Sequence, residues 1–284
     1  MFPILFSLGP LSISSIAIFL LLAWAIFSFS FWRSLRASAI QEDRIFDLTF
    51  YSTLILLVCA RLGFVVTHWD LFADSFLKIA ALWVTPGFSW YAGLAGAIVT
   101  LIYLSRSYKV RVGLVLDALA VSLPLATVVG KIGSFLDGAE IGRIAALPWA
   151  LSYPGYEGLR HPVQLYEIIA LLLIGGIMSL LQRRAVLRKW PYGLLGVVFF
   201  LLFTPVMFTL ELVKESSVYW VITANQWILI GFFAESLGAL YVRGGGREAM
   251  RVKTRRMMHG IHVKGSSIYA AISKRGAKRD QTSS

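Results

Sequence analysis

The chain has 284 residues, of which 57% are hydrophobic and only 15% are charged. Soluble domains carry about 25% charged residues, so this composition, with a mean hydropathy of +0.72, excludes an ordinary soluble protein. The net charge of +12 would suit a nucleic-acid partner. However, the basic residues lie in short clusters between apolar runs and after Tyr241. Membrane proteins distribute positive charge in this way, and no nucleic-acid partner is expected.

Apolar runs of about 20 residues are the signal of transmembrane helices. The chain contains seven: Ser12–Phe31, Leu48–Val66, Phe88–Leu104, Leu114–Phe135, Leu165–Leu181, Leu194–Val213 and Gln226–Val242. The fourth run is the weakest signal, because Asp117 and Lys131 lie inside it. These runs predict an all-α polytopic membrane protein with about seven transmembrane helices.

The distribution of Lys and Arg gives the predicted direction of the spans. With the N-terminus outside, 21 of the 27 Lys and Arg fall in segments on the cytoplasmic side. The other six are Arg61, Lys78, Lys131, Arg143, Arg160 and Lys214. Cytoplasmic loops are enriched in basic residues, and omitting the fourth run would break the alternation. The sequence therefore predicts an outside N-terminus and a cytoplasmic C-terminus.

The composition changes near residue 242, which divides the chain into two predicted parts. Residues 1–242 form the transmembrane domain, and 243–284 are polar, Gly-rich and basic. Such a segment is expected to be disordered. It would anchor the topology, and its positive charge would attract anionic lipid headgroups.

Three ionisable residues within the runs require an explanation, since a charge near the bilayer centre costs about 2.5–3.5 kcal/mol on insertion scales. They are Arg61, Lys131 and Glu211. The predicted topology places all three toward the outer face, where the loop carrying Arg143 also lies. One interpretation is snorkelling to the outer headgroups. The other is a basic cavity for a phosphate, with bidentate contacts from the arginines, a point charge from Lys131 and Glu211 balancing the cations.

Two segments around the long loop between the fourth and fifth runs are unusual. The 129–143 segment has four glycines, which suit close approach to a helix or to a ligand. In the 160–167 segment, Pro162 suits a first helical position, and Gln164 and Glu167 share one helix face. This helix start is either a plain polar cap or a place where free amides meet an anionic headgroup.

These segments resemble the bacterial prolipoprotein diacylglyceryl transferases. The resemblance rests on Arg61-Leu62-Gly63, Ser89-Trp90-Tyr91-Ala92-Gly93-Leu94, the glycine stretch ending at Gly142-Arg143, and Arg160-His161-Pro162-Val163-Gln164-Leu165-Tyr166-Glu167. It implies a seven-helix enzyme of the bacterial cytoplasmic (inner) membrane, with its N-terminus outside. Residues 1–242 would then be the transferase-like domain.

The resemblance also implies a reaction and its partners. The diacylglyceryl group of phosphatidylglycerol would pass to the lipobox cysteine thiol of a preprolipoprotein, forming a thioether in lipoprotein maturation. The expected partners are phosphatidylglycerol, lipobox signal peptides and membrane lipids. No cofactor or metal is expected. The nucleophile belongs to the substrate, and the chain's single cysteine, Cys59, lies in an apolar run.

The site residues are carried over position by position. The expected catalytic residues are Lys131, Arg143, His161 and Tyr91, with His161 helping to deprotonate the thiol. The expected substrate-binding residues are Arg61, Gly63, Ser134, Asp137, Gly142, Gln164, Tyr166, Glu167 and Glu211.

The chain departs from the family pattern at several of these positions. Lys131 stands where the family has Arg, Ser134 and Asp137 stand where it has Asn, Tyr91 replaces a usual His, and Met207 replaces an Arg. Two hypotheses follow. The chain is either a divergent active transferase or a non-catalytic membrane protein that binds phospholipid or signal peptides on the same scaffold.

Overall fold

The structure is a computed structural model that describes residues 4–8 and 11–244. Nearly all of the predicted tail, 243–284, lies outside the described residues. The chain divides into two units, Met1–Ser236 and Leu237–Ser284, and the description below concerns the first unit.

Long helices make up most of the described chain. They are α1 (Ser15–Arg36), α2 (Glu42–Thr67), α4 (Trp90–Ser107), α5 (Val112–Asp137), α6 (Val163–Leu187), α7 (Leu194–Glu211) and α8 (Ala224–Arg243), the last of which contains the boundary between the two units. Each of the seven predicted runs corresponds to one of these helices.

Five of the helices, α1, α2, α5, α6 and α7, are long and apolar enough to cross a membrane. The mostly helical fold with these five candidate spans is that of a polytopic membrane protein. The other two predicted spans, α4 and α8, do not reach this threshold. The 18 residues of α4 include Arg106, and α8 includes Asn225, Gln226 and Glu235.

The short elements lie in the connections. Three antiparallel hairpins pair β1 (Ile4–Leu8) with β2 (Leu11–Ser14), β3 (Leu151–Ser152) with β4 (Leu159–Arg160), and β5 (Val218–Tyr219) with β6 (Ile222–Thr223). The connection between α2 and α4 contains η1 (Trp69–Leu71) and α3 (Leu77–Ala80).

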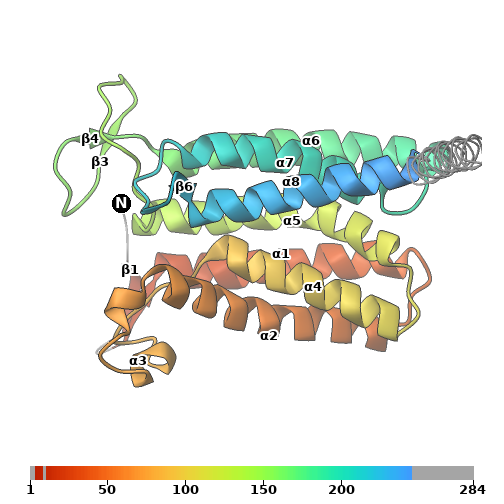
Figure 1. The fold of residues 1–284 in the computed structure, drawn as a ribbon, viewed down its shortest axis with the longest axis horizontal. Coiled ribbons are helices and arrows are strands. Elements are labelled where there is room, and N and C mark those ends of the chain that lie inside the picture. Colours follow the sequence, from red (N-terminus) through yellow and green to blue (C-terminus); the bar gives the residue numbers. More distant parts are fainter. Residues whose placement is uncertain (1–3, 9–10, 245–284) are drawn as a thin grey trace, which may run out of the picture. The chain divides into compact units, whose positions relative to one another are not determined.

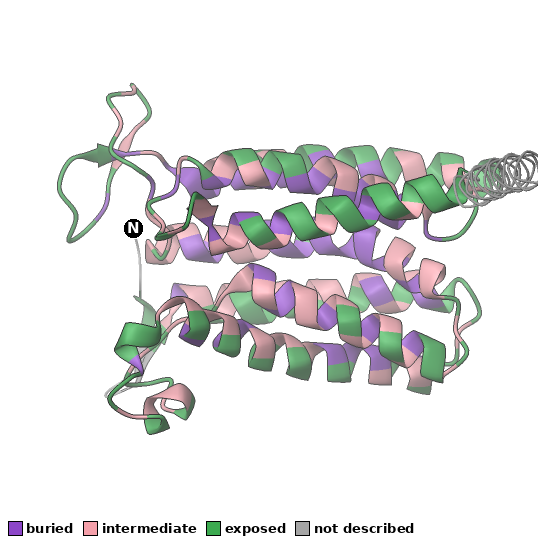
Figure 2. Ribbon diagram, in the orientation of Figure 1, coloured by how far each residue is buried: buried purple, intermediate pink, exposed green. Residues whose placement is uncertain are grey.

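Helix α5 is the centre of the packing (Figure 1). It packs along α1, α6 and α7, while α2 packs along α4. Its buried residues include Leu119 and Leu123, and it meets the buried rings of Phe199 and Phe203 in the same apolar core. Exposed positions follow the outer helices (Figure 2). Large apolar side chains such as Leu173 are among the exposed residues. In a membrane protein such side chains meet lipid rather than water.

Glycines allow the helices to approach closely. A Cβ atom on Gly63 of α2 would lie 2.3 Å from the Cβ of Ala92 on α4, and one on Gly133 of α5 would lie 2.4 Å from the Cβ of Phe19 on α1. Both glycines therefore serve helix packing of the small-residue kind common in membranes. For Gly133, this supports the packing interpretation of the glycine-rich segment.

The acidic residue inside α5 is explained by a helix terminus. The Asp117 carboxylate accepts hydrogen bonds from the backbone amides of Gly193 (2.6 Å) and Gly196 (2.9 Å) at the start of α7. Helix N-termini carry partial positive charge and unpaired amides. An acid that would be costly alone in the membrane therefore caps a neighbouring helix.

Candidate active site

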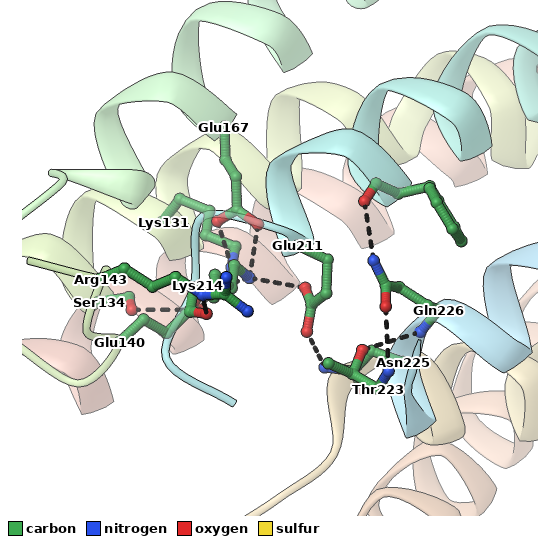
Figure 3. Close-up of polar contacts among 11 residues, drawn as sticks. Lys131, Ser134, Glu140, Arg143, Glu167, Glu211, Lys214, Thr223, Asn225 and Gln226 are labelled. Carbon is green, nitrogen blue, oxygen red and sulfur yellow. Dashed lines mark hydrogen bonds and ion pairs between the residues drawn. The ribbon is translucent and has the colours of Figure 1, made fainter. Parts of the chain in front are cut away.

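Five charged residues from three elements and two connections meet at one end of the bundle (Figure 3). They are Lys131 on α5, Glu140 in the following loop, Glu167 on α6, Glu211 at the end of α7, and Lys214 just beyond it. We call these five residues the carboxylate–lysine cluster.

Both lysines of the cluster bridge two or more carboxylates. The Lys131 Nζ lies 2.5 Å from an oxygen of Glu140 and 2.6 Å from one of Glu167. The Lys214 Nζ lies 2.8 Å from the second oxygen of each of these glutamates and 3.3 Å from Glu211. Glu140 and Glu167 are therefore each shared by the two ammonium groups.

Most of the cluster is buried, and it carries one more acid than base. The Glu167 and Glu211 residues are each 1% exposed. A buried charge is tolerated only when it is paired and hydrogen-bonded. The second oxygen of Glu211 meets this need by accepting a hydrogen bond from the Asn225 side-chain amide at 2.6 Å.

Mutual attraction keeps Glu140 and Lys214 ionised. Burial alone would raise the pKa of the Glu140 carboxyl, but Lys131 and Lys214 lower it well below its ordinary value of 4.5. Burial alone would lower the pKa of the Lys214 ammonium, but the glutamates around it, Glu140 first, raise it well above its ordinary value of 10.5. Both groups are charged at neutral pH.

A short backbone ladder holds the loop that supplies Glu140 against the end of α7. The Arg143 amide donates to the Val213 carbonyl and the Glu215 amide donates to the Ile141 carbonyl, both at 2.9 Å. Between them, Gly142 pairs with Lys214 in an antiparallel bridge. The ladder therefore places Arg143 beside the cluster.

Arg143 has a guanidinium that is open to a ligand. Its Nε donates to the Lys214 carbonyl at 3.3 Å, and the residue is exposed. Within residues 4–8 and 11–244, its two terminal nitrogens make no hydrogen bond or ion pair. Because a guanidinium offers two parallel N–H donors to a phosphate, this side chain is the cation of the site best prepared to bind one.

Comparison with known proteins decides the family. The family model of prolipoprotein diacylglyceryl transferase matches residues 3–242. The chain belongs to this family. Phosphatidylglycerol–prolipoprotein diacylglyceryl transferases are among its relatives. That of Aeromonas hydrophila is 30% identical over 221 residues, covering 75% of this chain and 78% of the relative. That of Mannheimia succiniciproducens is 28% identical over 262 residues, covering 88% and 95%.

Not every residue expected from the family resemblance lies in the cluster. The Arg61 side chain donates four hydrogen bonds of 2.8–3.0 Å to the carbonyls of Lys78, Ile79, Thr85 and Gly87. Its guanidinium also lies 5.1 Å from the centre of the Phe72 ring. Four of its five N–H donors are therefore used to hold the α2–α4 connection, and no bidentate fork remains for a phosphate in this conformation.

His161 lies beside the site rather than in the cluster. Its amide donates to the Arg143 carbonyl at 3.1 Å, and its Nδ1 is 3.3 Å from the Tyr166 hydroxyl oxygen. That oxygen also accepts a hydrogen bond from the Trp149 indole at 2.7 Å. In the tautomer that carries its proton on Nδ1, His161 donates to the Tyr166 oxygen and Nε2 is left as the acceptor of the ring.

Gln164 and Ser134 contact Glu140. The Gln164 amide donates to the Glu140 carbonyl at 2.5 Å, and its oxygen accepts from the Tyr153 hydroxyl at 3.0 Å. The Ser134 hydroxyl donates weakly to the Glu140 carboxylate at 3.4 Å. Both residues position Glu140 within the fold.

The remaining expected residues lie on the surrounding helices. Tyr91 is buried on α4, within electrostatic reach of Lys214 and the three glutamates. Met207 is buried on α7, one turn before Glu211. Asp137 ends α5, where Gly138 takes a left-handed conformation with φ of 73°. A Cβ on Gly142 would lie 2.2 Å from the His161 carbonyl oxygen, so this position requires glycine.

Glu140 is not among the residues expected at the site, and Lys214 was expected only as an outer basic residue. Both are central to the cluster. A signal for each was present. Glu140 lies in the glycine-rich segment two residues before Gly142, and Lys214 follows Glu211 by three positions, a spacing at which side chains meet on a helix.

Proposed function

We propose that this chain transfers the diacylglyceryl group of phosphatidylglycerol to the lipobox cysteine of a prolipoprotein. Membership of the family over residues 3–242 is the observation that carries the proposal. Relatives covering most of the chain bear the name of this activity. The open guanidinium of Arg143, next to the carboxylate–lysine cluster, supports an active site at this end of the bundle.

The reaction replaces one bond to carbon by another. The cysteine sulfur bonds to the glyceryl carbon while the bond between that carbon and the phosphate oxygen breaks. Glycerol phosphate leaves, and the thiol proton passes to a base. The lipid supplies the electrophile and the prolipoprotein supplies the nucleophile, so no oxidant, reductant or metal is needed to balance the step.

Charge develops on the leaving phosphate, and cations must stabilise it. Arg143 is assigned this role because its terminal nitrogens have no partner among the described residues, whereas three carboxylates neutralise Lys131 and Lys214. Lys131 would contribute a fixed positive charge nearby.

His161 is proposed to accept the thiol proton through Nε2, because a neutral imidazole has one ring nitrogen that can accept a proton. Tyr91 would assist through its buried hydroxyl. The other expected residues of the proposed substrate site are Ser134, Asp137, Gly142, Gln164, Tyr166, Glu167 and Glu211. Arg61 and Gly63 would support the site only indirectly, by holding the α2–α4 connection and the packing of α2 on α4.

We further propose that all seven long helices span the bacterial cytoplasmic membrane, with the N-terminus outside and the basic 243–284 segment inside as a separate part. The clustering of Lys and Arg supports this topology. In this topology the carboxylate–lysine cluster would lie near the outer face.

A non-catalytic lipid or signal-peptide binder is the second candidate. It is favoured by Met207, which is apolar and buried where the family resemblance expects an arginine. It is also favoured by Lys131, whose ammonium is already shared by two carboxylates.

Complementation distinguishes the two candidates. A strain depleted of its own transferase and expressing this chain is expected to grow and to make a model lipoprotein with thioether-linked diacylglycerol, identified by mass spectrometry. Failure to modify the lipoprotein, although the chain is present in the membrane and binds phosphatidylglycerol, would leave the binder as the function.

A further inference from the structure

A cavity lies at the opposite end of the bundle from the carboxylate–lysine cluster. It has a volume of about 410 Å³ and is lined by three connections: α1–α2 with the start of α2, α4–α5 with the start of α5, and α6–α7. These connections come together at the end of the helices away from β3, β4 and β6 (Figure 1). Ligand pockets of roughly 300–1,000 Å³ hold small molecules.

The walls of this cavity are positively charged. Arg44, Lys109 and Arg111 line it, and no Asp or Glu is among the lining residues. The Arg44 guanidinium is fixed by a hydrogen bond of 2.9 Å to the Tyr108 carbonyl. Arg111 lies 5.3 Å over the ring of Tyr192, which holds it at the rim. Within the described residues the Lys109 ammonium has no hydrogen-bond or ion-pair partner.

Three of the acidic residues close to the cavity in sequence are engaged elsewhere, and a fourth, Asp43, is exposed and does not line the cavity. Glu42 pairs with Arg36 at 3.1 Å, Asp47 accepts the hydroxyl proton of Tyr108 at 2.8 Å, and Asp117 caps α7. The three cations of the cavity therefore lie close together, and none of these acids forms an ion pair with them.

The topology alone does not require this arrangement. The positive-inside rule accounts for basic residues in a cytoplasmic connection. It does not require that cations from two connections line one cavity, or that Tyr192 of a third connection completes its wall. Convergent Arg and Lys side chains are the chemistry that recognises phosphate, the former by parallel N–H donors and the latter as a point charge.

We propose that this cavity binds a phosphate group, either on the headgroup of an anionic phospholipid or as a free phosphate. The site is separate from the proposed active site and does not depend on the proposed function.

Binding to the purified full chain tests the proposal with two probes. Isothermal titration with inorganic phosphate, at constant ionic strength, reports the free anion. Native mass spectrometry after incubation in phosphatidylcholine nanodiscs with and without phosphatidic acid reports the lipid. The Lys109→Gln and Arg111→Gln double variant is expected to lose at least tenfold in affinity for the ligand that the cavity takes.

The matched control is the Arg33→Gln and Arg106→Gln double variant, which removes the same charge from exposed positions that do not line the cavity. It is expected to change affinity less than threefold. Loss of phosphate binding in the cavity variant alone assigns a free anion, and loss of phosphatidic acid alone assigns a lipid headgroup. Equal effects of the two double variants, or a wild type that binds neither probe, would overturn the proposal.

Folding and activity are controlled separately. Lys109→Gln alone, which leaves the Arg111–Tyr192 contact intact, is expected to weaken binding several-fold with an unchanged gel-filtration profile. The rate of diacylglyceryl transfer is expected to stay within twofold of wild type in both cavity variants, because none of these residues belongs to the active-site end.

Discussion

At the residue scale, the buried ions of the carboxylate–lysine cluster depend on one another. Each lysine touches Glu140 and Glu167, so the loss of either acid leaves two buried ammonium groups with reduced compensation. Removing one partner of a buried ion pair costs more than the pair itself contributes, because the remaining charge stays desolvated. We expect Glu140→Gln to lower the free energy of unfolding by about 2 kcal/mol. This loss is smaller than that for a fully buried ion pair, because Glu140 is partly exposed.

The midpoint of thermal unfolding in detergent checks this. Glu157→Gln removes the same charge from an exposed position of the same connection and is expected to leave the midpoint within about 1 °C. An equal effect of the two substitutions would contradict the role assigned to Glu140.

The pH dependence of stability follows from the same contacts. The folded pKa of Glu140 is lowered, so its contribution is present above about pH 4.5 and is lost as the pH falls through the folded pKa. The folded pKa of Lys214 is raised, so its contribution is present below about pH 10.5 and is lost as the pH rises through the folded pKa. Unfolding midpoints measured between pH 3 and 6 should fall less steeply with acid in Glu140→Gln than in the wild type.

At the element scale, three helices end at the cavity end of the bundle with the same backbone motif. In α1, α4 and α6 a residue just beyond the helix takes a left-handed conformation, and none of the three is glycine: Ala39 (φ 58°), Lys109 (φ 55°) and Lys189 (φ 50°). The following amide then bonds back five residues, as in Trp190 to Ala185 at 3.0 Å. Such helix ends favour glycine, since a Cβ atom disfavours this conformation.

Lys189→Gly should therefore stabilise the protein by about 1 kcal/mol. Lys189→Ala removes the same side-chain charge but keeps the Cβ atom, so it should give no gain. Thermal unfolding of the two variants side by side makes the comparison. A gain shared by both would point to charge instead of backbone conformation.

The connection between α5 and α6 depends on close backbone contact at Gly142. A Cβ there would lie 2.2 Å from the carbonyl oxygen of His161, and backbone cannot yield as a side chain can. We expect Gly142→Ala to displace Arg143 from its position beside the cluster and to reduce transfer at least tenfold. Gly155→Ala is the control in the same connection, since its added Cβ meets nothing within 4 Å, although its φ of 81° makes it slightly strained. Its transfer rate should stay within about twofold of wild type.

At the scale of the whole molecule, the two ends of the bundle carry different chemistry. The carboxylate–lysine cluster and Arg143 lie at one end, and the basic cavity lies at the other. The proposed topology places the first outside and the second in the cytoplasm. Single cysteines in a Cys59→Ser background test this in intact cells with an impermeant maleimide. Glu157→Cys should react from outside, and Arg106→Cys only after the membrane is permeabilised; the reverse pattern would contradict the topology.

The helices could be predicted from the sequence because their signal is local. Each apolar run corresponds to a helix, and the run interrupted by Asp117 and Lys131 is the central helix α5. Backbone amides at the start of α7 bind the Asp117 carboxylate, and two glutamates pair with Lys131. Two of the seven helices, α4 and α8, are less apolar than the five candidate spans. The polar residues responsible are Arg106 in α4, and Asn225, Gln226 and Glu235 in α8.

The site was less predictable because its pairing is not local. Lys131, Glu167 and Glu211 were expected to lie near the site, but their shared partners Glu140 and Lys214 come from connections whose course only the fold determines. Arg61 shows the opposite case. Its charge predicted a phosphate-binding residue, whereas its guanidinium donates hydrogen bonds to backbone carbonyls of the α2–α4 connection. The path of this connection cannot be predicted from sequence patterns.

The central claim is that this chain performs diacylglyceryl transfer and that Arg143 stabilises the leaving phosphate. The most direct measurement is the rate of thioether formation on a lipobox peptide by the purified full chain in phosphatidylglycerol nanodiscs, for wild type and Arg143→Ala. We expect measurable turnover by the wild type and a loss of roughly 10²–10³ in the variant, the usual cost of removing a preorganised charge-stabilising donor. Wild-type protein that binds lipid and peptide but forms no thioether, or Arg143→Ala at the wild-type rate, would contradict the claim.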